Sequence, residues 1–294
     1  MEDTESILTR SSTLGLPVRR VICSHETGLD FRVLEVEDET GRLWMLRIPR
    51  HEVARGKIDR EAKLLSRLKE CWPFQSPEWR ILAPDFIAYP RLDGILAYSY
   101  NIAPPEGPWR IDRNNNTFIE SFARTVAALH SIPAEKIMPE DKPKQTISDV
   151  REDLLSDIAR VKASLGVMAR ENQWREWIDN DSYWPEETVL THGDLYAGHV
   201  VTDETGKVSG FIDWADAKFD DPSVDMSAQF VMLNPHGFLL FLRAYAESGG
   251  HLWPRVEDHV IQRAFAYPLT FATYALDSGN PLLLEKARVE IKAS

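Results

Sequence analysis

Side chains suited to chemistry gather in two short segments in the second half of the chain. The first runs from His192 to His199 and reads His-Gly-Asp-Leu-Tyr-Ala-Gly-His, and the second runs from Ile212 to Trp214. Apolar residues typical of a short strand precede the active groups of each segment. We therefore expect Asp194 and Asp213 at strand ends, where a rigid scaffold presents side chains to a site.

This set of groups matches what phosphoryl transfer needs. The reaction requires a carboxylate that orients the attacking hydroxyl, and metal ligands that bridge the donor phosphates. Asp194 offers the first carboxylate, His199 a ligand five residues on, and Asp213 a further carboxylate beyond a hairpin. An isolated His-Gly-Asp usually marks a turn, so the prediction depends on all three groups together. His192 is expected to hold the loop backbone. The four side chains would also suit Zn²⁺ or Mn²⁺ in a hydrolase, which stays an alternative.

The first third of the chain must form a sheet that supports part of this site. Short apolar runs bounded by turn residues predict strands over 18–23, 31–37 and 43–48, and two more within 81–98. A charged helix with apolar residues at helical spacing is expected over 57–70.

The remainder of the chain reads as helical. From residue 117 onward apolar residues recur at helical spacing, with one interruption by a hairpin over 199–214. Trp174, Trp177 and Trp184 are expected to pack in a core and not to stack on a ligand. The fold class is therefore α+β, with a small antiparallel lobe carrying one helix and a large, mostly helical lobe. We place the first lobe at residues 1–92 and the second at 93–294.

Composition and charge narrow the classes of partner. The formal net charge of −12 argues against nucleic acid, whose phosphates favour clustered Lys and Arg, and it suits a cationic ligand. No apolar stretch approaches the ~20 residues that span a bilayer, and the first residues lack the apolar core of a signal peptide. We therefore expect a cytoplasmic protein with no membrane partner, and a monomer. Cys23 and Cys71 are expected to be free thiols.

The two segments resemble the motifs of the aminoglycoside phosphotransferase and choline kinase superfamily, which has a two-lobed, protein-kinase-like fold. Within it the chain is most similar to the macrolide 2'-phosphotransferases, and the likeness runs from about Leu16 to the end. Besides the two segments, the stretches that carry this narrower resemblance are Gly28 to Phe31, Trp44 to Arg50, and Ala275 to Asn280.

The resemblance implies a role for each polar group of the second lobe. Asp194 would be the catalytic base. His199, where the superfamily usually has an Asn, and Asp213 would bind Mg²⁺; oxygen ligands are the more usual choice for this ion. Asp221 and Asp225 fall on later acidic positions of the motif and would brace the loop that carries the base.

The resemblance also implies a donor site in the first lobe. The Lys that contacts the donor phosphates in the superfamily is replaced by Arg47, whose planar fork of donors can do the same work. Arg47 would pair with Glu61 on the following helix. Gly28 lies in the loop expected to cover the phosphates, although a single Gly is a weak motif alone.

The base of the nucleotide would be recognised by the backbone of the connection between the lobes. By position the groups are the carbonyl of Pro90 and the backbone of Leu92, with Ile212 completing the predicted cofactor-binding set. Because proline has no N–H, the connection relies on carbonyl acceptors at that point. Guanine presents donors there, and the resemblance also implies GTP, so we expect GTP in preference to ATP.

The acceptor implied by the resemblance is the 2'-hydroxyl of the amino sugar of a macrolide antibiotic, which phosphorylation would inactivate. Such a substrate is large, apolar and cationic, and it needs an apolar groove with carboxylates near the sugar. The candidates are Phe230, Leu233, Phe271 and Tyr274 for the groove, and Asp216 and Asp277 for the ammonium. The alternatives are a kinase of another small alcohol, such as an aminoglycoside or choline, and a non-catalytic nucleotide-binding module.

Overall fold

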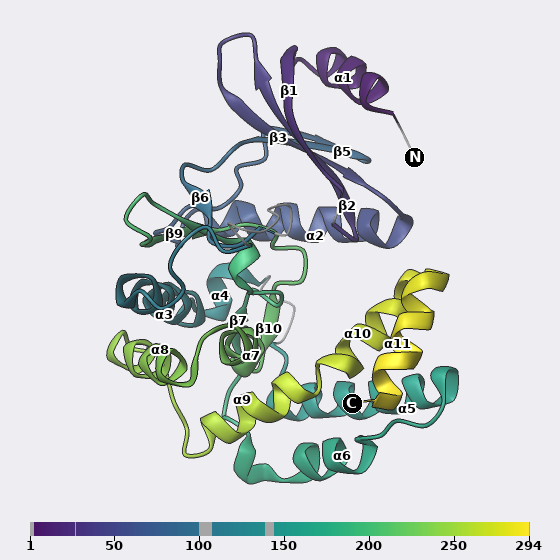
Figure 1. Cartoon of the computed structure of the whole chain (residues 1–294), viewed down its shortest axis with the longest axis vertical. Helices are drawn as coiled ribbons and strands as arrows, with labels where there is room; N and C mark the ends of the chain where they lie inside the picture. Colours follow the sequence, from purple (N-terminus) through teal and green to yellow (C-terminus); the bar gives the residue numbers. More distant parts are fainter. Residues whose placement is uncertain (1–2, 27, 100–107, 139–143, 294) are drawn as a thin grey trace.

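A computed structural model describes residues 3–26, 28–99, 108–138 and 144–293 and shows two lobes, one above the other in Figure 1. The upper lobe holds a five-stranded antiparallel sheet with strand order β1-β2-β3-β5-β4. Its elements are α1 (Thr4–Thr13), β1 (Val18–His25), β2 (Phe31–Asp38), β3 (Leu43–Pro49), α2 (Glu52–Leu68), β4 (Ile81–Ala83) and β5 (Phe86–Pro90).

Alternation along the strands gives the sheet two apolar faces, as side chains of period two require. Leu34, Leu46 and Phe86 point to one face and pack with Ile7 of α1. The neighbouring residues of the same strands point to the other face, where Ile87 and others pack against α2. The sheet is therefore covered on both sides, and α2 lies between it and the lower lobe (Figure 1).

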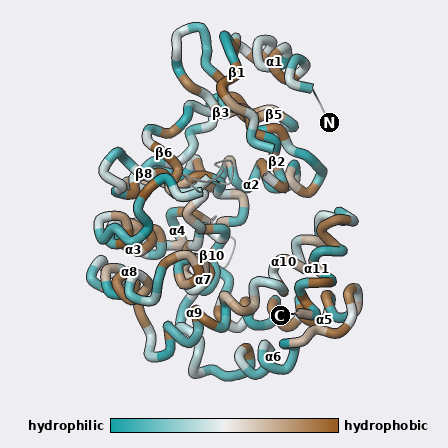
Figure 2. Tube along the Cα trace, in the orientation of Figure 1, coloured by the Kyte–Doolittle hydropathy of each residue, from teal (hydrophilic) through white to brown (hydrophobic). Residues whose placement is uncertain are grey.

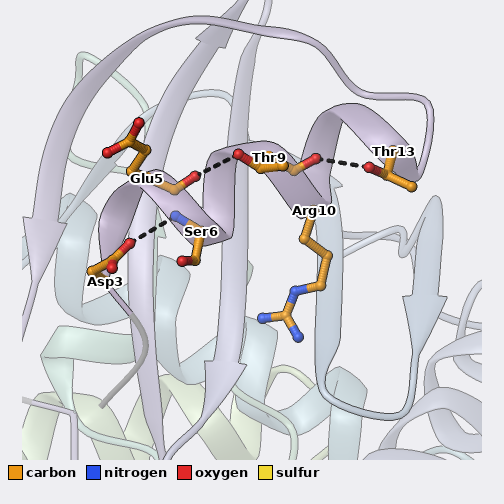
Figure 3. Close-up of a pocket in the computed structure, with 6 residues that line it drawn as sticks. All are labelled: Asp3, Glu5, Ser6, Thr9, Arg10 and Thr13. Atoms are coloured by element: carbon orange, nitrogen blue, oxygen red, sulfur yellow. Dashed lines mark hydrogen bonds between the residues drawn. The ribbon is translucent and has the colours of Figure 1, made fainter.

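The helix α1 is a correction to the single helix predicted for this lobe. Of its apolar side chains only Ile7 is fully buried, so the sequence carries little helical periodicity there. Local hydrogen bonds define it instead: Asp3 accepts from the Ser6 N–H at 2.8 Å, and the Thr9 hydroxyl donates to the Glu5 carbonyl at 3.0 Å. Figure 3 shows these contacts along the polar face, where the shallow hollow lined by α1 lies.

The lower lobe is mostly helical, as predicted. Its strands are β6 (Ile95–Leu96), β7 (Val189–Thr191), β8 (Val200–Thr202), β9 (Val208–Phe211) and β10 (Lys218–Asp220). Its helices are α3 (Asn116–His130), α4 (Ala134–Ile137), α5 (Ile147–Leu165), α6 (Glu171–Asp179), α7 (Ser223–Met232), α8 (Pro235–Glu247), α9 (Val256–Phe265), α10 (Tyr267–Ser278) and α11 (Pro281–Ala293), with 3-10 turns at Asp181–Tyr183 and Ala197–His199.

Two small sheets carry the segments singled out above. The strands β8 and β9 form the predicted hairpin, and β6 joins it to give the order β6-β8-β9. The strand β7 pairs with β10 in a second sheet. The upper sheet ends at Pro90 and β6 begins at Ile95 in a different sheet, so the predicted boundary at residue 92 falls between them.

Two apolar cores hold the helices of the lower lobe. One joins α3, α7 and α8 to β8 and β9, and the other joins α5, α6, α10 and α11. Trp174, Trp177 and Trp184 are buried in the second core, which confirms their predicted packing role. In Figure 2 the brown, hydrophobic stretches recur along the strands and helices.

Two smaller predictions can be compared with the structure. Cys23 and Cys71 are both free thiols, as expected. Every helix in the part of the chain that the structure describes falls short of the length and apolarity that a membrane crossing needs.

Candidate active site

The loop formed by residues 192–199 follows β7 directly, and its path depends on Gly193. This residue has φ +88°, a backbone conformation that is strained for any residue with a side chain. A Cβ at Gly193 would lie 2.3 Å from the backbone oxygen of Asp216, so no larger residue fits without moving one of the two segments. The 192–199 loop and the segment after Asp213 are thus packed backbone to backbone.

Asp225 holds this loop from below, which confirms the bracing role expected for it. Its fully buried carboxylate accepts from the N–H of His192 at 2.8 Å and from the N–H of Gly193 at 3.0 Å. The ring of His130 lies 3.2 Å from the same carboxylate and also contacts the hydroxyl of Tyr245. Charge-assisted bonds of this kind fix the loop at the two residues preceding Asp194.

Asp221 has a different place from the one expected. It contacts His259, Arg263 and Ser223, and these contacts join the start of α7 to α9. Burial disfavours its charge, but the partners His259 and Arg263 hold the pKa of this carboxyl far below its usual range. Its visible role is thus to fasten two helices, one step removed from the 192–199 loop.

His192 connects the two segments, as the structural role predicted for it requires. Its Nε2 donates to the carbonyl of Ile212 at 2.9 Å, and its Nδ1 accepts from the N–H of Asp194 at 3.4 Å. One nitrogen donates and the other accepts, so the ring is neutral. Complete burial also lowers the pKa of His192.

Asp194, His199 and Asp213 come together at the surface between the lobes. The Nδ1 of His199 donates to the carbonyl of Asp194 at 2.8 Å, which leaves the lone pair of a neutral ring on Nε2. That nitrogen faces a carboxylate oxygen of Asp213 at 3.6 Å. Two acceptors facing each other suit a cation between them, and a metal-binding His typically donates its other N–H to a carbonyl in this way.

Asp213 itself has a backbone conformation that points to function. Its φ of +65° is the one positive value among the described residues other than glycine, and such strain clusters at functional sites. Desolvation by the surrounding protein disfavours its charge, but Arg47 and His199 together keep the pKa of Asp213 below its ordinary value. Its side chain is 41% exposed, so the carboxylate remains available to a ligand.

Arg47 forms the ion pair with Glu61 that was predicted from the sequence, and it forms a second ion pair with Asp213. It donates to Glu61 at 2.8 Å and to Asp213 at 2.9 Å, and its guanidinium lies 4.1 Å from the ring centre of Phe31. Glu61 also accepts from the N–H of Trp214 at 3.2 Å. Arg47 therefore links β3, α2 and the segment that carries Asp213.

Asp194 has the surroundings of a group that exchanges a proton. Its side chain is 56% exposed, yet desolvation by the surrounding protein raises its pKa above the usual value, and the charges of Asp213 and Asp216 raise it further. The nearby ring of His199 opposes this effect. A raised pKa on an accessible carboxylate is typical of a general base.

The other residues predicted to bind the nucleotide lie in the turn before β2, at the end of β5 and just after it, and directly before Asp213. Leu92 and Ile212 pack in one apolar cluster below β2 and β3. The Arg91 N–H donates to Leu43 on β3, so the carbonyl of Pro90, one residue earlier, points away from β3. At Gly28 a Cβ would lie 2.7 Å from the Phe31 carbonyl, so the tight turn before β2 needs glycine.

The residues predicted to bind the acceptor do not form one group. Phe230 is partly buried beside Phe238, and Leu233 is buried in the same core. Phe271 is buried in the other core of the lobe. Asp277 is paired with Arg160 of α5.

The other two acceptor candidates have partners that the sequence did not indicate. The Tyr274 hydroxyl donates to Asp30 at 2.7 Å, and Asp216 accepts from Lys57 at 2.8 Å. Lys57 belongs to α2, the charged helix that the sequence predicted. Asp30 lies in one of the stretches that carry the resemblance, and this was the one signal for it.

Fold and site together define a kinase-like phosphotransferase, and the two-lobed fold predicted from the sequence is confirmed. The chain belongs to the phosphotransferase enzyme family APH, whose model matches residues 21–259. It is therefore an enzyme that transfers a phosphoryl group to a hydroxyl.

Three known proteins illustrate the similarity. A structure named macrolide 2'-phosphotransferase type I superposes with a TM-score of 0.91 at 34% identity, covering 100% of this chain and 99% of that one. The apoenzyme of macrolide 2'-phosphotransferase MphH from Brachybacterium faecium gives 0.87 at 29% identity, covering 99% of both chains. The uncharacterized protein YcbJ of Bacillus subtilis (strain 168) is 31% identical over 259 residues, 86% of this chain and 84% of the relative.

Proposed function

We propose that this enzyme transfers the γ-phosphoryl group of GTP to the 2'-hydroxyl of the amino sugar of a macrolide antibiotic, and thereby inactivates the antibiotic. The observation that carries the proposal is the end-to-end similarity to two structures named macrolide 2'-phosphotransferase, at TM-scores of 0.91 and 0.87. The proposed enzyme is a monomer and acts in the cytoplasm, where nucleoside triphosphates are available.

Asp194 is the proposed catalytic base. In the reaction, the acceptor oxygen forms a bond to the γ-phosphorus as the bond to the bridging oxygen of the donor breaks, and the hydroxyl proton passes to Asp194. The exposure of this carboxylate and its raised pKa support the role. Asp225 and Gly193 support it indirectly, because they fix the loop that holds Asp194.

His199 and Asp213 are the proposed metal ligands. These two side chains would hold Mg²⁺, which would supply positive charge against the negative charge that develops in the transfer. Two protein ligands suffice for this ion, which keeps water and phosphate oxygens in its other positions. A zinc hydrolase has less support, because the described residues contain no group of three or more His, Cys, Asp and Glu side chains that could hold a metal.

The donor site is proposed on the upper lobe. Arg47 would contact the phosphates, with Glu61 fixing its position and the Gly28 turn covering them. The apolar cluster with Leu92 and Ile212 would take the base. GTP is preferred in the proposal because the Pro90 carbonyl offers an acceptor, and guanine offers donors at that edge.

The acceptor site is proposed on the lower lobe, close to Asp194. Asp216 is the stronger candidate for the ammonium because it is half exposed and its backbone packs against Gly193. The half-buried Phe230 is a candidate for the apolar groove. The weaker candidates already have other partners in the protein. They are Leu233 and Phe271, which pack in the two cores, Tyr274, which is hydrogen-bonded to Asp30, and Asp277, which is paired with Arg160.

A coupled turnover assay tests the proposal. The enzyme is supplied with Mg²⁺ and either GTP or ATP, and with erythromycin, kanamycin or choline as acceptor. Turnover of erythromycin with GTP supports both parts of the proposal. Turnover of kanamycin or choline alone would refute the macrolide assignment and favour a kinase of another small alcohol, whereas turnover with ATP alone would refute the donor.

A further inference from the structure

One carboxylate on the upper lobe accepts from donors of two separate segments, α10 and the first turns of α2. Asp30, directly before β2, accepts from the Tyr274 hydroxyl at 2.7 Å and from the ammonium of Lys57 at 3.1 Å. The Nε2 of His51 lies 3.3 Å away. Because the Nδ1 of His51 accepts from the N–H of Ala54, its Nε2 carries a proton and donates to Asp30 even in the neutral ring.

Lys57 extends this cluster to the segment that follows Asp213. Its ammonium contacts Asp216 at 2.8 Å as well as Asp30, and lies 6.0 Å from the centre of the Tyr274 ring. The side chains of Asp30 and Lys57 are 17% and 20% exposed, so the contacts are largely shielded from water. Burial disfavours the charge of Lys57, but its two carboxylates raise its pKa above the ordinary value.

The hydrogen bond between Asp30 and Tyr274 joins residues that are 244 positions apart and belong to different lobes. The helix α10 otherwise packs mainly on α5, α9 and α11. Figure 1 shows α10 and α11 rising from the lower lobe toward the part of the upper lobe where β2 and α2 lie. The connection from β5 to β6 joins the lobes at the opposite side of the view.

We propose that Asp30, Lys57 and Tyr274 form a latch that closes the lobes over the donor nucleotide at the end of the site remote from the β5–β6 connection. The three are positioning residues, since they hold the turn at Gly28 and do not touch the reacting atoms. This inference rests on the phosphotransferase activity of the family and on the proposed donor site, and it is independent of which acceptor is used.

The placement of Asp30 gives the latch its effect. Asp30 is two residues from Gly28, and its carbonyl accepts from the N–H of Arg50 at 2.8 Å, so the turn is tied to the end of β3 and moves with the upper sheet. A nucleotide whose phosphates lie under this turn leaves when the turn lifts, and lifting it separates Asp30 from Tyr274. Loss of the Tyr274 hydroxyl should therefore speed nucleotide release more than it slows the chemical step.

The test compares Tyr274→Phe, Asp30→Ala and the double variant with the wild-type enzyme. Stopped-flow measurements follow the release of a fluorescent N-methylanthraniloyl derivative of GTP or ATP in the presence of Mg²⁺ and the absence of acceptor. Tyr267→Phe is the matched control, because it removes a hydroxyl from the same helix at a side chain that is 63% exposed. Melting temperatures report whether each variant is folded.

We expect Tyr274→Phe to release the nucleotide about 5- to 10-fold faster, as befits one partly shielded hydrogen bond to a charged group. KM for the donor should rise with it while kcat changes less, and the same substitution should have no added effect in the Asp30→Ala background. Release at the wild-type rate in Tyr274→Phe, or equal acceleration in the Tyr267→Phe control, would overturn the latch. Failure to bind either nucleotide in the wild type would refute the donor site itself.

Discussion

Replacing Arg47 by Lys, the residue usual at this position in the superfamily, tests whether the protein needs the several donors of an arginine here. Arg47 contacts Glu61 and Asp213 with different nitrogens and stacks on Phe31. Lysine keeps the charge, but its single compact ammonium cannot hold both carboxylates and the aromatic ring at once. Glu61 has a fully buried side chain and should keep the ammonium, whereas Asp213 is 41% exposed and can be hydrated instead.

The magnitude follows from these exposures. The lost contact with Asp213 is partly screened by water and is worth about 1 kcal/mol. The lost stack on Phe31 adds about 1 kcal/mol. Arg47→Lys should therefore lower the free energy of unfolding by about 2 kcal/mol and raise KM for the donor by roughly 5- to 10-fold, because Asp213 is no longer held in place.

Chemical denaturation measures the first effect, and the turnover assay with varied donor measures the second. Arg42→Lys, at an exposed position of the turn between β2 and β3, is the control for a general effect of the substitution. If Arg47→Lys unfolds at the wild-type denaturant concentration and keeps the wild-type KM, the bridging argument is wrong. A fall in stability with unchanged KM would limit Arg47 to a structural role.

Three further variants test other parts of the site. Asp194→Asn should lower the transfer rate by about 100-fold or more while nucleotide affinity in a fluorescence titration stays the same, and substantial residual transfer would contradict its role as base. Gly193→Ala should cost about 2 kcal/mol in denaturation experiments, because the new Cβ would meet the Asp216 backbone at φ +88°; a wild-type midpoint would show that the loop yields easily. Replacing Asp38 tests how the β2–β3 turn responds to acid. Hydrogen bonds from the Thr40 hydroxyl, the Trp44 side chain and backbone N–H groups lower the pKa of Asp38 to about 2 from the ordinary 3.8. The charged Asp38 contributes its full share to the free energy of unfolding above pH 3.8 and loses it as the pH falls toward 2. The difference in free energy of unfolding between wild type and Asp38→Asn should therefore shrink by about 2 kcal/mol between pH 4 and pH 2. Equal acid sensitivity of the two proteins would refute this reasoning.

Most elements of the fold were predictable because their signals are local. The strands of the upper sheet alternate apolar and polar residues, and Phe118 and Phe122 in α3 recur at helical spacing and are buried. The helix α1 was missed because Ile7 alone among its apolar residues is fully buried, so its face carries too few apolar residues to form a pattern.

The candidate site shows the same division. The spacing of Asp194, His199 and Asp213 predicted their meeting, since a hairpin between two short strands returns the chain to the same edge. The partners of Tyr274 and Asp277 could not be predicted, because each lies on another element far away in sequence. No local pattern records which helix face meets which loop.

The sequence by itself determined which residues could carry phosphoryl transfer and which segments would form strands or helices. These properties depend on residue type and on spacing within one element. Asp221 and Asp225 had the same expected role at the level of the sequence, and the tertiary structure decided that Asp225 braces the 192–199 loop while Asp221 fastens α7 to α9. Two acidic residues four positions apart look alike in the sequence. Their roles differ because packing of the helices directs one carboxylate to the loop backbone and buries the other against His259 and Arg263.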